Sequence, residues 1–200
     1  TSNDPMNQEK LSFTSFPNLG MQTTHSSNSF ITDSAAAGTA LATGHKTDND
    51  VVGVDPSKKI KFKTMAEMAK EKGMKVGIVS SVSLDHATPA AFYAHKASRN
   101  DLYDIGIDMT NSGFDYFAGG GLLQPTGKKK DQPNVLDIAK QKGYKIVNDP
   151  NAIMNLTKID GKVIAFRNDL AAESAMQYDI DRQDKTSLAD YTKKGNELLD

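Results

Sequence analysis

Two segments of the chain share one pattern, an amphipathic stretch that ends at a glycine and is followed at once by a short apolar run. The first covers residues 63–83 and the second residues 134–147. In each, apolar side chains recur at the spacing of one helical face, and glycine is the residue that most often follows the end of a helix. The run after it resembles a strand buried on both faces. Repeated alternation of this kind predicts an α/β fold with a mostly parallel sheet.

The individual elements follow from the same patterns. The predicted helical faces are Met65, Met68 and Ala69 before Gly73, and Val135, Ile138 and Ala139 before Gly143. Strands are predicted near Phe30, at residues 76–79, at residues 114–117, around Ile146 and at residues 163–166. One further helix is predicted to begin at Ser34 and stop at Gly44, and another to begin after a capping Thr186 or Ser187.

The charge balance excludes some classes of partner. Lys and Arg number 24 against 25 Asp and Glu, which gives a net charge of -1. Such a chain has no broad positive field, so we expect it to bind neither nucleic acid nor an anionic membrane. It has no cysteine, which leaves the redox compartment open. No run of about 18 apolar residues occurs, and the first residues do not have the pattern of a signal peptide.

The most informative local feature is Ser34, which follows Asp33 at the predicted start of a helix of small residues. A serine there points its hydroxyl toward unpaired helix N–H groups, which favour negative charge and suit a covalent nucleophile. The alternative from this pattern alone is that Asp33 or Ser34 simply caps the helix. Arg99 has the same ambiguity, since its planar fork suits phosphate but an isolated arginine more often forms a surface ion pair.

A longer motif favours the functional reading. Residues 31–44, ITDSAAAGTALATG, resemble the signature of alkaline phosphatases, in which Asp-Ser-Ala-Ala is followed by small residues and a threonine. Downstream, residues 88–91 and 98–99 match the Thr-Pro-Ala-Ala and Ser-Arg stretches of that family in the same order. The resemblance continues through residues 44–55, 64–81, 114–121 and 188–194, and so covers essentially the whole chain.

The resemblance implies a specific chemistry. An enzyme of this kind hydrolyses phosphate monoesters through a phosphoserine, with Zn²⁺ and Mg²⁺ as cofactors. Ser34 would be the nucleophile and contact zinc, Arg99 would bind phosphate, and Asp33 would orient Arg99. Thr88 would give its hydroxyl to Mg²⁺, and His86 would lie beside the magnesium ligands without contacting the ion. The resemblance also implies a periplasmic or secreted homodimer.

Parts of the family pattern are missing. The family's metal-bridging aspartate precedes the nucleophile by more residues than this sequence has there, and its magnesium glutamate and zinc-binding Asp and His residues follow the helix that begins near Thr186. We therefore expect residues 1–30 to form an irregular arm and residues 31–200 an incomplete catalytic domain, with an incomplete alkaline-phosphatase-like α/β sandwich. By itself this chain is expected to be inactive and to bind zinc weakly.

Three alternatives remain open at this point. The chain could belong to a phosphodiesterase or a phosphomutase of the same superfamily, in which the nucleophile is commonly threonine. It could also be a non-catalytic α/β fragment that only binds phosphate. Ser34 together with Arg99 favours the phosphatase over the other two enzymes.

Overall fold

The computed structural model describes residues 11–158, 161–167, 169–182 and 186–200. The helices are α1 (Ser34–Thr43), α2 (Met65–Glu71), α3 (Ala87–Ala90), α4 (Leu102–Asn111), α5 (Val135–Gln141), α6 (Pro150–Met154) and α7 (Leu188–Leu199). The strands are β1 (Gly77–Ser80), β2 (Tyr116–Gly119), β3 (Tyr144–Val147) and β4 (Lys162–Phe166). Short 3-10 helices include η1 (Ser12–Ser15) and η3 (Ala172–Ser174).

The four strands form one parallel sheet in the order β1-β2-β4-β3. Tyr116 of β2 pairs with Gly77 on one side and with Val163 of β4 on the other. The two central strands are almost wholly buried, which explains why they are continuous apolar runs without alternation. The predicted mostly parallel sheet is therefore confirmed.

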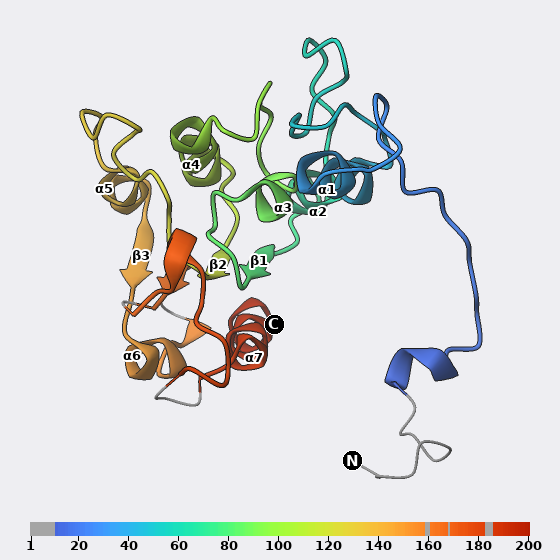
Figure 1. The fold of residues 1–200 in the computed structure, drawn as a ribbon. Helices are drawn as coiled ribbons and strands as arrows, with labels where there is room; N and C mark the ends of the chain where they lie inside the picture. Colours follow the sequence, from blue (N-terminus) through green and yellow to red (C-terminus); the bar gives the residue numbers. More distant parts are fainter. Residues whose placement is uncertain (1–10, 159–160, 168, 183–185) are drawn as a thin grey trace.

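Alternate side chains of the central strands point into two separate apolar clusters. Phe117 and Ile164 lie in the first, together with residues of α2, α4 and α5. Tyr116 and Val163 lie in the second, together with residues of α6 and α7. The helices of the two groups lie on opposite faces of the sheet in Figure 1. This arrangement is an α/β sandwich, as the sequence predicts.

The predicted helix ends are also confirmed. Gly73 follows α2 and Gly143 follows α5, and both have a positive φ, of 78° and 83°. Gly44 ends α1 in the left-handed region with φ 76°. At the other end of the chain, Ser187 caps α7 by accepting a hydrogen bond from the N–H of Asp190.

The strand predicted near Phe30 is wrong. Residues 29–33 form no strand, and Phe30 and Ile31 are 97% and 82% exposed. Two backbone groups of this segment are bonded by a side chain and not by a neighbouring strand. The Ile31 carbonyl accepts a hydrogen bond from Nδ2 of Asn49, and the Asp33 N–H donates to Oδ1 of the same residue. Short apolar runs do not form strands without a strand partner.

The buried helical face predicted for α2 is also partly wrong. Met65 and Met68 are 53% and 44% exposed, whereas Ala66 of the same helix is buried. Met65 borders a groove of about 540 Å³ that runs along β1. Within the described residues, β1 is bonded to β2 alone, so its other edge is free. The incomplete sheet predicted from the sequence matches this open edge.

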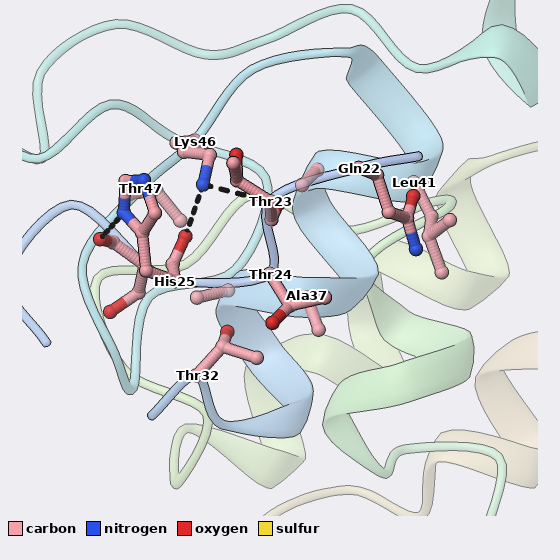
Figure 2. Close-up of a pocket in the computed structure, with 12 residues that line it drawn as sticks. Gln22, Thr23, Thr24, His25, Thr32, Ala37, Leu41, Lys46 and Thr47 are labelled. Atoms are coloured by element: carbon pink, nitrogen blue, oxygen red, sulfur yellow. Dashed lines mark hydrogen bonds between the residues drawn. The ribbon is translucent and has the colours of Figure 1, made fainter. Parts of the chain in front are cut away.

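The described part of the predicted arm, residues 11–30, contains η1 and otherwise no helix or strand. In Figure 1 the segment that carries η1 stands away from the sheet. Closer to α1 the arm is held in place, because Nζ of Lys46 donates hydrogen bonds to the carbonyls of Thr23 and His25 (Figure 2). A pocket of about 180 Å³ lies between this part of the arm and α1.

Candidate active site

The site begins at the N-terminus of α1. Asp33 is the capping residue, and its Oδ1 accepts a hydrogen bond of 2.9 Å from the N–H of Ala36. Ser34 is the first helical residue, is half-buried, and makes no hydrogen bond through its hydroxyl to any described residue. A helix N-terminus favours negative charge, so an anion near Ser34 would be stabilised.

A close helix contact brings the second motif next to the first. Helix α1 packs against α3, which contains Thr88. At Gly38 of α1, an added Cβ atom would lie 2.9 Å from Cβ of Ala91 and 3.4 Å from the carbonyl oxygen of Thr88. Only glycine therefore allows this separation of the two helices. Gly38, which belongs to the first motif, is therefore also needed for the packing of α1 against α3.

Arg99 joins the two motifs through its side chain. Its NH1 group donates to Oδ2 of Asp33 at 3.1 Å, and its NH2 group lies 3.2 Å from Nε2 of His86. The prediction that Asp33 orients Arg99 is consistent with this ion pair and stays a prediction. Two of the five guanidinium N–H donors are used, which leaves three for a ligand.

The electrostatics of Asp33 favour its charged form. Burial raises the pKa of this carboxyl, but several hydrogen bonds outweigh burial and hold the pKa below its ordinary value. The donors are the N–H groups of Ala36 and Asp50 and the guanidinium of Arg99, whose positive charge acts in the same direction. Asp33 is thus a carboxylate that can hold a cation in place.

His86 is held in its neutral form. Burial lowers the pKa of this imidazole, and the positive charge of Arg99 lowers it further, while Glu173 acts in the opposite direction. A neutral imidazole has one acceptor nitrogen. Its Nδ1 lies 3.4 Å from the N–H of Thr88, and its Nε2 lies closer to a charged donor. We therefore assign the acceptor to Nε2, which bonds the NH2 group of Arg99 while Asp33 bonds the NH1 group.

Thr88 is exposed, and only its backbone N–H contacts this cluster, through His86. It is the second residue of α3 and borders the groove along the free edge of β1. The structure thus joins Asp33, His86 and Arg99 by side-chain contacts, with Ser34 next to Asp33 in the chain, and Thr88 lines the groove. Its predicted contact with Mg²⁺ stays a prediction.

Two residues of the site were not predicted from the sequence. Asn49 and Asp50 make hydrogen bonds to the backbone or side chain of Asp33, and Asp50 also bonds the residues around Arg99. The only local signal was an Asn-Asp pair in a short polar stretch, which is typical of turns.

The described residues do not by themselves fit a zinc or magnesium site. No three His, Cys, Asp or Glu side chains among them lie close enough together to hold a metal ion. The ring of His45 stacks on Phe62, and His95 bonds Gly53 and Glu67. Protein zinc sites use three or four such ligands, and hydroxyls alone cannot replace them. The arrangement can, however, bind an anion between Arg99 and the start of α1.

Comparisons with known proteins identify the family of the chain. The family model described as alkaline phosphatase matches residues 1–125. Alkaline phosphatase 4 of Bacillus subtilis is 38% identical over 198 residues, which are 94% of this chain and 41% of that protein. Alkaline phosphatase 3 of the same organism is 36% identical over 87% of this chain and 37% of its own length. The chain thus spans about two fifths of the length of these relatives.

Solved structures give the same result for the fold. The alkaline phosphatase of the Antarctic bacterium TAB5 has a TM-score of 0.78 and 34% identity, and the match covers 94% of this chain and 53% of that one. A variant of that enzyme, described with Mg bound in its M3 site, also has a TM-score of 0.78 and 34% identity over 94% of this chain and 52% of its own. Because the family model matches more than half of the chain and a relative that is 38% identical matches 94% of it, this chain belongs to the alkaline phosphatase family.

Proposed function

We propose that this chain is the nucleophile-bearing part of an enzyme that hydrolyses phosphate monoesters through a phosphoserine at Ser34. The observation that carries the proposal is the ion pair between Arg99 and Asp33, the residue next to Ser34. Because Asp33 directly precedes Ser34, the first residue of α1, we propose that the guanidinium charge acts on the Ser34 hydroxyl. Membership of the alkaline phosphatase family supports the same reaction.

Each residue has a defined role in the proposed reaction. The oxygen of Ser34 attacks phosphorus, the bond from phosphorus to the alcohol oxygen breaks, and the alcohol leaves with a proton. Water then cleaves the phosphoserine and releases inorganic phosphate. Arg99 binds two phosphate oxygens through its remaining donors and stabilises their charge as it shifts during transfer. Asp33 and His86 hold the guanidinium in the plane needed for these bonds.

We further propose that Zn²⁺ and Mg²⁺ bind in the longer protein, with Ser34 near zinc, Thr88 on magnesium, and His86 beside the magnesium ligands. Because the described residues supply too few ligands, the others would come from segments that the relatives have and this chain does not. The description of the TAB5 variant with Mg bound supports magnesium in this family. The free edge of β1, with Thr88 nearby, is where we propose that a further strand of the longer protein pairs.

Cell location and assembly rest on the family alone. We propose a periplasmic or secreted homodimer. No helix among the described residues is long and apolar enough to cross a bilayer.

Trapping of the phosphoenzyme tests the proposed reaction. A version extended to the length of the relatives is incubated with radiolabelled aryl phosphate, quenched in acid, and mapped for phosphoserine. We expect label on Ser34 that disappears in Ser34→Ala and persists in Ser29→Ala, which alters a serine of the arm. Label that persists in Ser34→Ala would refute the assignment. Faster hydrolysis of an aryl phosphodiester than of the monoester would favour the phosphodiesterase alternative.

A further inference from the structure

Three segments far apart in the sequence meet at the candidate site. They are the turn before α1, the loop that carries Arg99, and the segment 46–50 between α1 and α2. The first two segments contain the residues of the proposed reaction. The third contains none of them, yet Asn49 and Asp50 within it bond both of the others.

Asn49 fixes the backbone of the nucleophile turn. Its Oδ1 accepts a hydrogen bond of 3.1 Å from the N–H of Asp33, and its Nδ2 donates one of 3.0 Å to the carbonyl of Ile31. Its own N–H donates to Oδ1 of Asn28 at 3.0 Å. One amide side chain thus holds the two peptide groups that lead into Ser34.

Asp50 holds the other half of the site with its backbone. Its N–H donates to Oδ2 of Asp33 at 3.0 Å, and the same oxygen accepts the hydrogen bond from Arg99. Its carbonyl accepts a hydrogen bond of 2.6 Å from the N–H of Arg99. The peptide groups of Asp50 therefore contact both members of the ion pair and fix which carboxylate oxygen faces the guanidinium.

The carboxylate of Asp50 holds the loop around Arg99. Its Oδ2 accepts a hydrogen bond of 2.7 Å from Oγ of Ser98, and its Oδ1 accepts one of 3.3 Å from Nδ2 of Asn100. These are the residues on either side of Arg99. Because the carboxylate is engaged by neutral donors, the guanidinium is paired with Asp33 and not with Asp50.

The segment is itself anchored, and its conformation is unusual. Asp50 has φ 73°, a left-handed conformation that Asn, Asp and Gly adopt more readily than other residues. At the other end of the segment, Lys46 binds two carbonyls of the arm (Figure 2), and the carbonyl of Thr47 accepts a hydrogen bond from the N–H of Ser27. The segment is thus held at both ends, so it can position what it contacts.

We infer that Asn49 and Asp50 are positioning residues of the active site, which set the orientation of Asp33 and Arg99 so that phosphate meets both the guanidinium and Ser34. Neither residue is needed to contact phosphate. The expected effect of these residues on catalysis rests on the proposed function. Their effect on the order of the Arg99 side chain does not, because that order can be measured without any reaction.

The positive φ of Asp50 allows a test that separates side chain from backbone. Asp50→Gly keeps the left-handed conformation and both peptide groups but removes the carboxylate, whereas Asp50→Asn keeps an acceptor for Ser98. Asp48→Gly is the matched control, because it places the same flexible residue two positions away at a side chain that makes no hydrogen bond to a described residue.

The probe is inorganic phosphate, titrated against this chain while the guanidinium resonances of Arg99 are followed by NMR. We expect Asp50→Gly and Asn49→Ala to weaken phosphate binding about tenfold, the effect of losing one or two net hydrogen bonds that order the site. Without phosphate, the Arg99 NH1 and NH2 resonances should be separate in the unaltered chain and in Asp50→Asn, and averaged in Asp50→Gly. Unchanged resonances and affinity in Asp50→Gly would overturn the inference.

Two further variants keep the test decisive. If Asp50→Gly does not fold, Ser98→Ala combined with Asn100→Ala removes the same two hydrogen bonds from the opposite side, and the same averaging of Arg99 is expected. If that double variant leaves the Arg99 resonances separate, the inference is refuted. Arg99→Ala tests the proposed function instead. If phosphate affinity does not change in this variant, Arg99 does not bind phosphate, and this result is independent of the role of Asp50.

Discussion

His95 joins two parts of the structure through both nitrogens of its ring. Nδ1 lies 2.9 Å from the carbonyl oxygen of Gly53, and Nε2 lies 2.8 Å from Oε1 of Glu67. Both partners accept hydrogen bonds, so the two bonds exist together only when both nitrogens carry a proton. Burial lowers the pKa of His95, but the Glu67 carboxylate and the Gly53 carbonyl outweigh burial and the charge of Lys61 and raise the pKa above its ordinary value.

The direction of this shift gives the direction of the pH effect. A group with a raised pKa in the folded state stabilises that state fully below its ordinary pKa of 6.5, and the contribution is lost as pH rises through the folded pKa. Burial raises the pKa of Glu67, but the hydrogen bonds from His95 and Thr64 lower it overall, so its contribution is lost only as acid protonates it. The pair is therefore strongest between the ordinary values of the two groups, 4.5 and 6.5.

We estimate the size of the effect from the contact. A hydrogen bond to a charged group contributes about 1.5–3 kcal/mol, and the lower end applies here because the Glu67 side chain is 29% exposed to screening water. We expect the free energy of unfolding to fall by about 1–2 kcal/mol between about pH 6 and about pH 9 through His95 alone.

Urea unfolding at these two pH values, followed by circular dichroism, measures the effect. His95→Gln should be less stable than the unaltered chain at the lower pH. Its free energy of unfolding should also change much less between the two pH values. His45→Gln is the control, because its ring stacks on Phe62 and bridges no such pair. An equal fall in stability between the two pH values for the unaltered chain and for His95→Gln would refute the reasoning.

Three other predictions concern the site and its support. Arg99→Ala should weaken phosphate binding by roughly 2–4 kcal/mol in calorimetry of the extended protein if the two bonds to phosphate are desolvated, and an unchanged affinity would make Arg99 a structural residue. Gly38→Val should lower the free energy of unfolding by about 1–3 kcal/mol through overpacking against α3, with exposed Leu41→Val of the same helix as the control for β-branching. Calorimetry of this chain with Zn²⁺ should show weak binding or none, and stoichiometric binding at micromolar affinity would contradict the ligand assignment.

The sequence predicted those elements whose side-chain spacing reflects burial directly. Strands β2 and β4 are buried on both faces, so their continuous apolar runs left little choice of structure. The same argument failed at Phe30, where three apolar or β-branched residues in a row have no strand beside them in the described part of the chain. It also failed for Met65, because a helical apolar face is as compatible with an open groove as with a filled core.

Only those site residues that lie within a recognisable sequence motif could be predicted. Ser34, Asp33 and Arg99 lie in two motifs that resemble a known family, and the structure brings them together. The contacts of Asp50 instead join residues separated by 17 and 48 positions, and polar residues of a short loop carry no periodicity from which such contacts follow. The positive φ that suits an Asp at this position becomes visible only once the loop is folded.

The same loop explains how a site formed mostly by irregular segments can be well ordered. Residues 50–53 run antiparallel to residues 95–99, and they are joined at three successive points. Asp50 bonds the N–H of Arg99, Val52 exchanges two backbone hydrogen bonds with Lys96, and Gly53 accepts one from the ring of His95. Neutral His95 can keep only one of its two ring hydrogen bonds, so raising the pH weakens support at the end of this ribbon opposite Arg99. Because the two bonds of Val52 lie between, the order of Arg99 should survive that loss, and Arg99 should respond to Asp50→Gly far more than to His95→Gln.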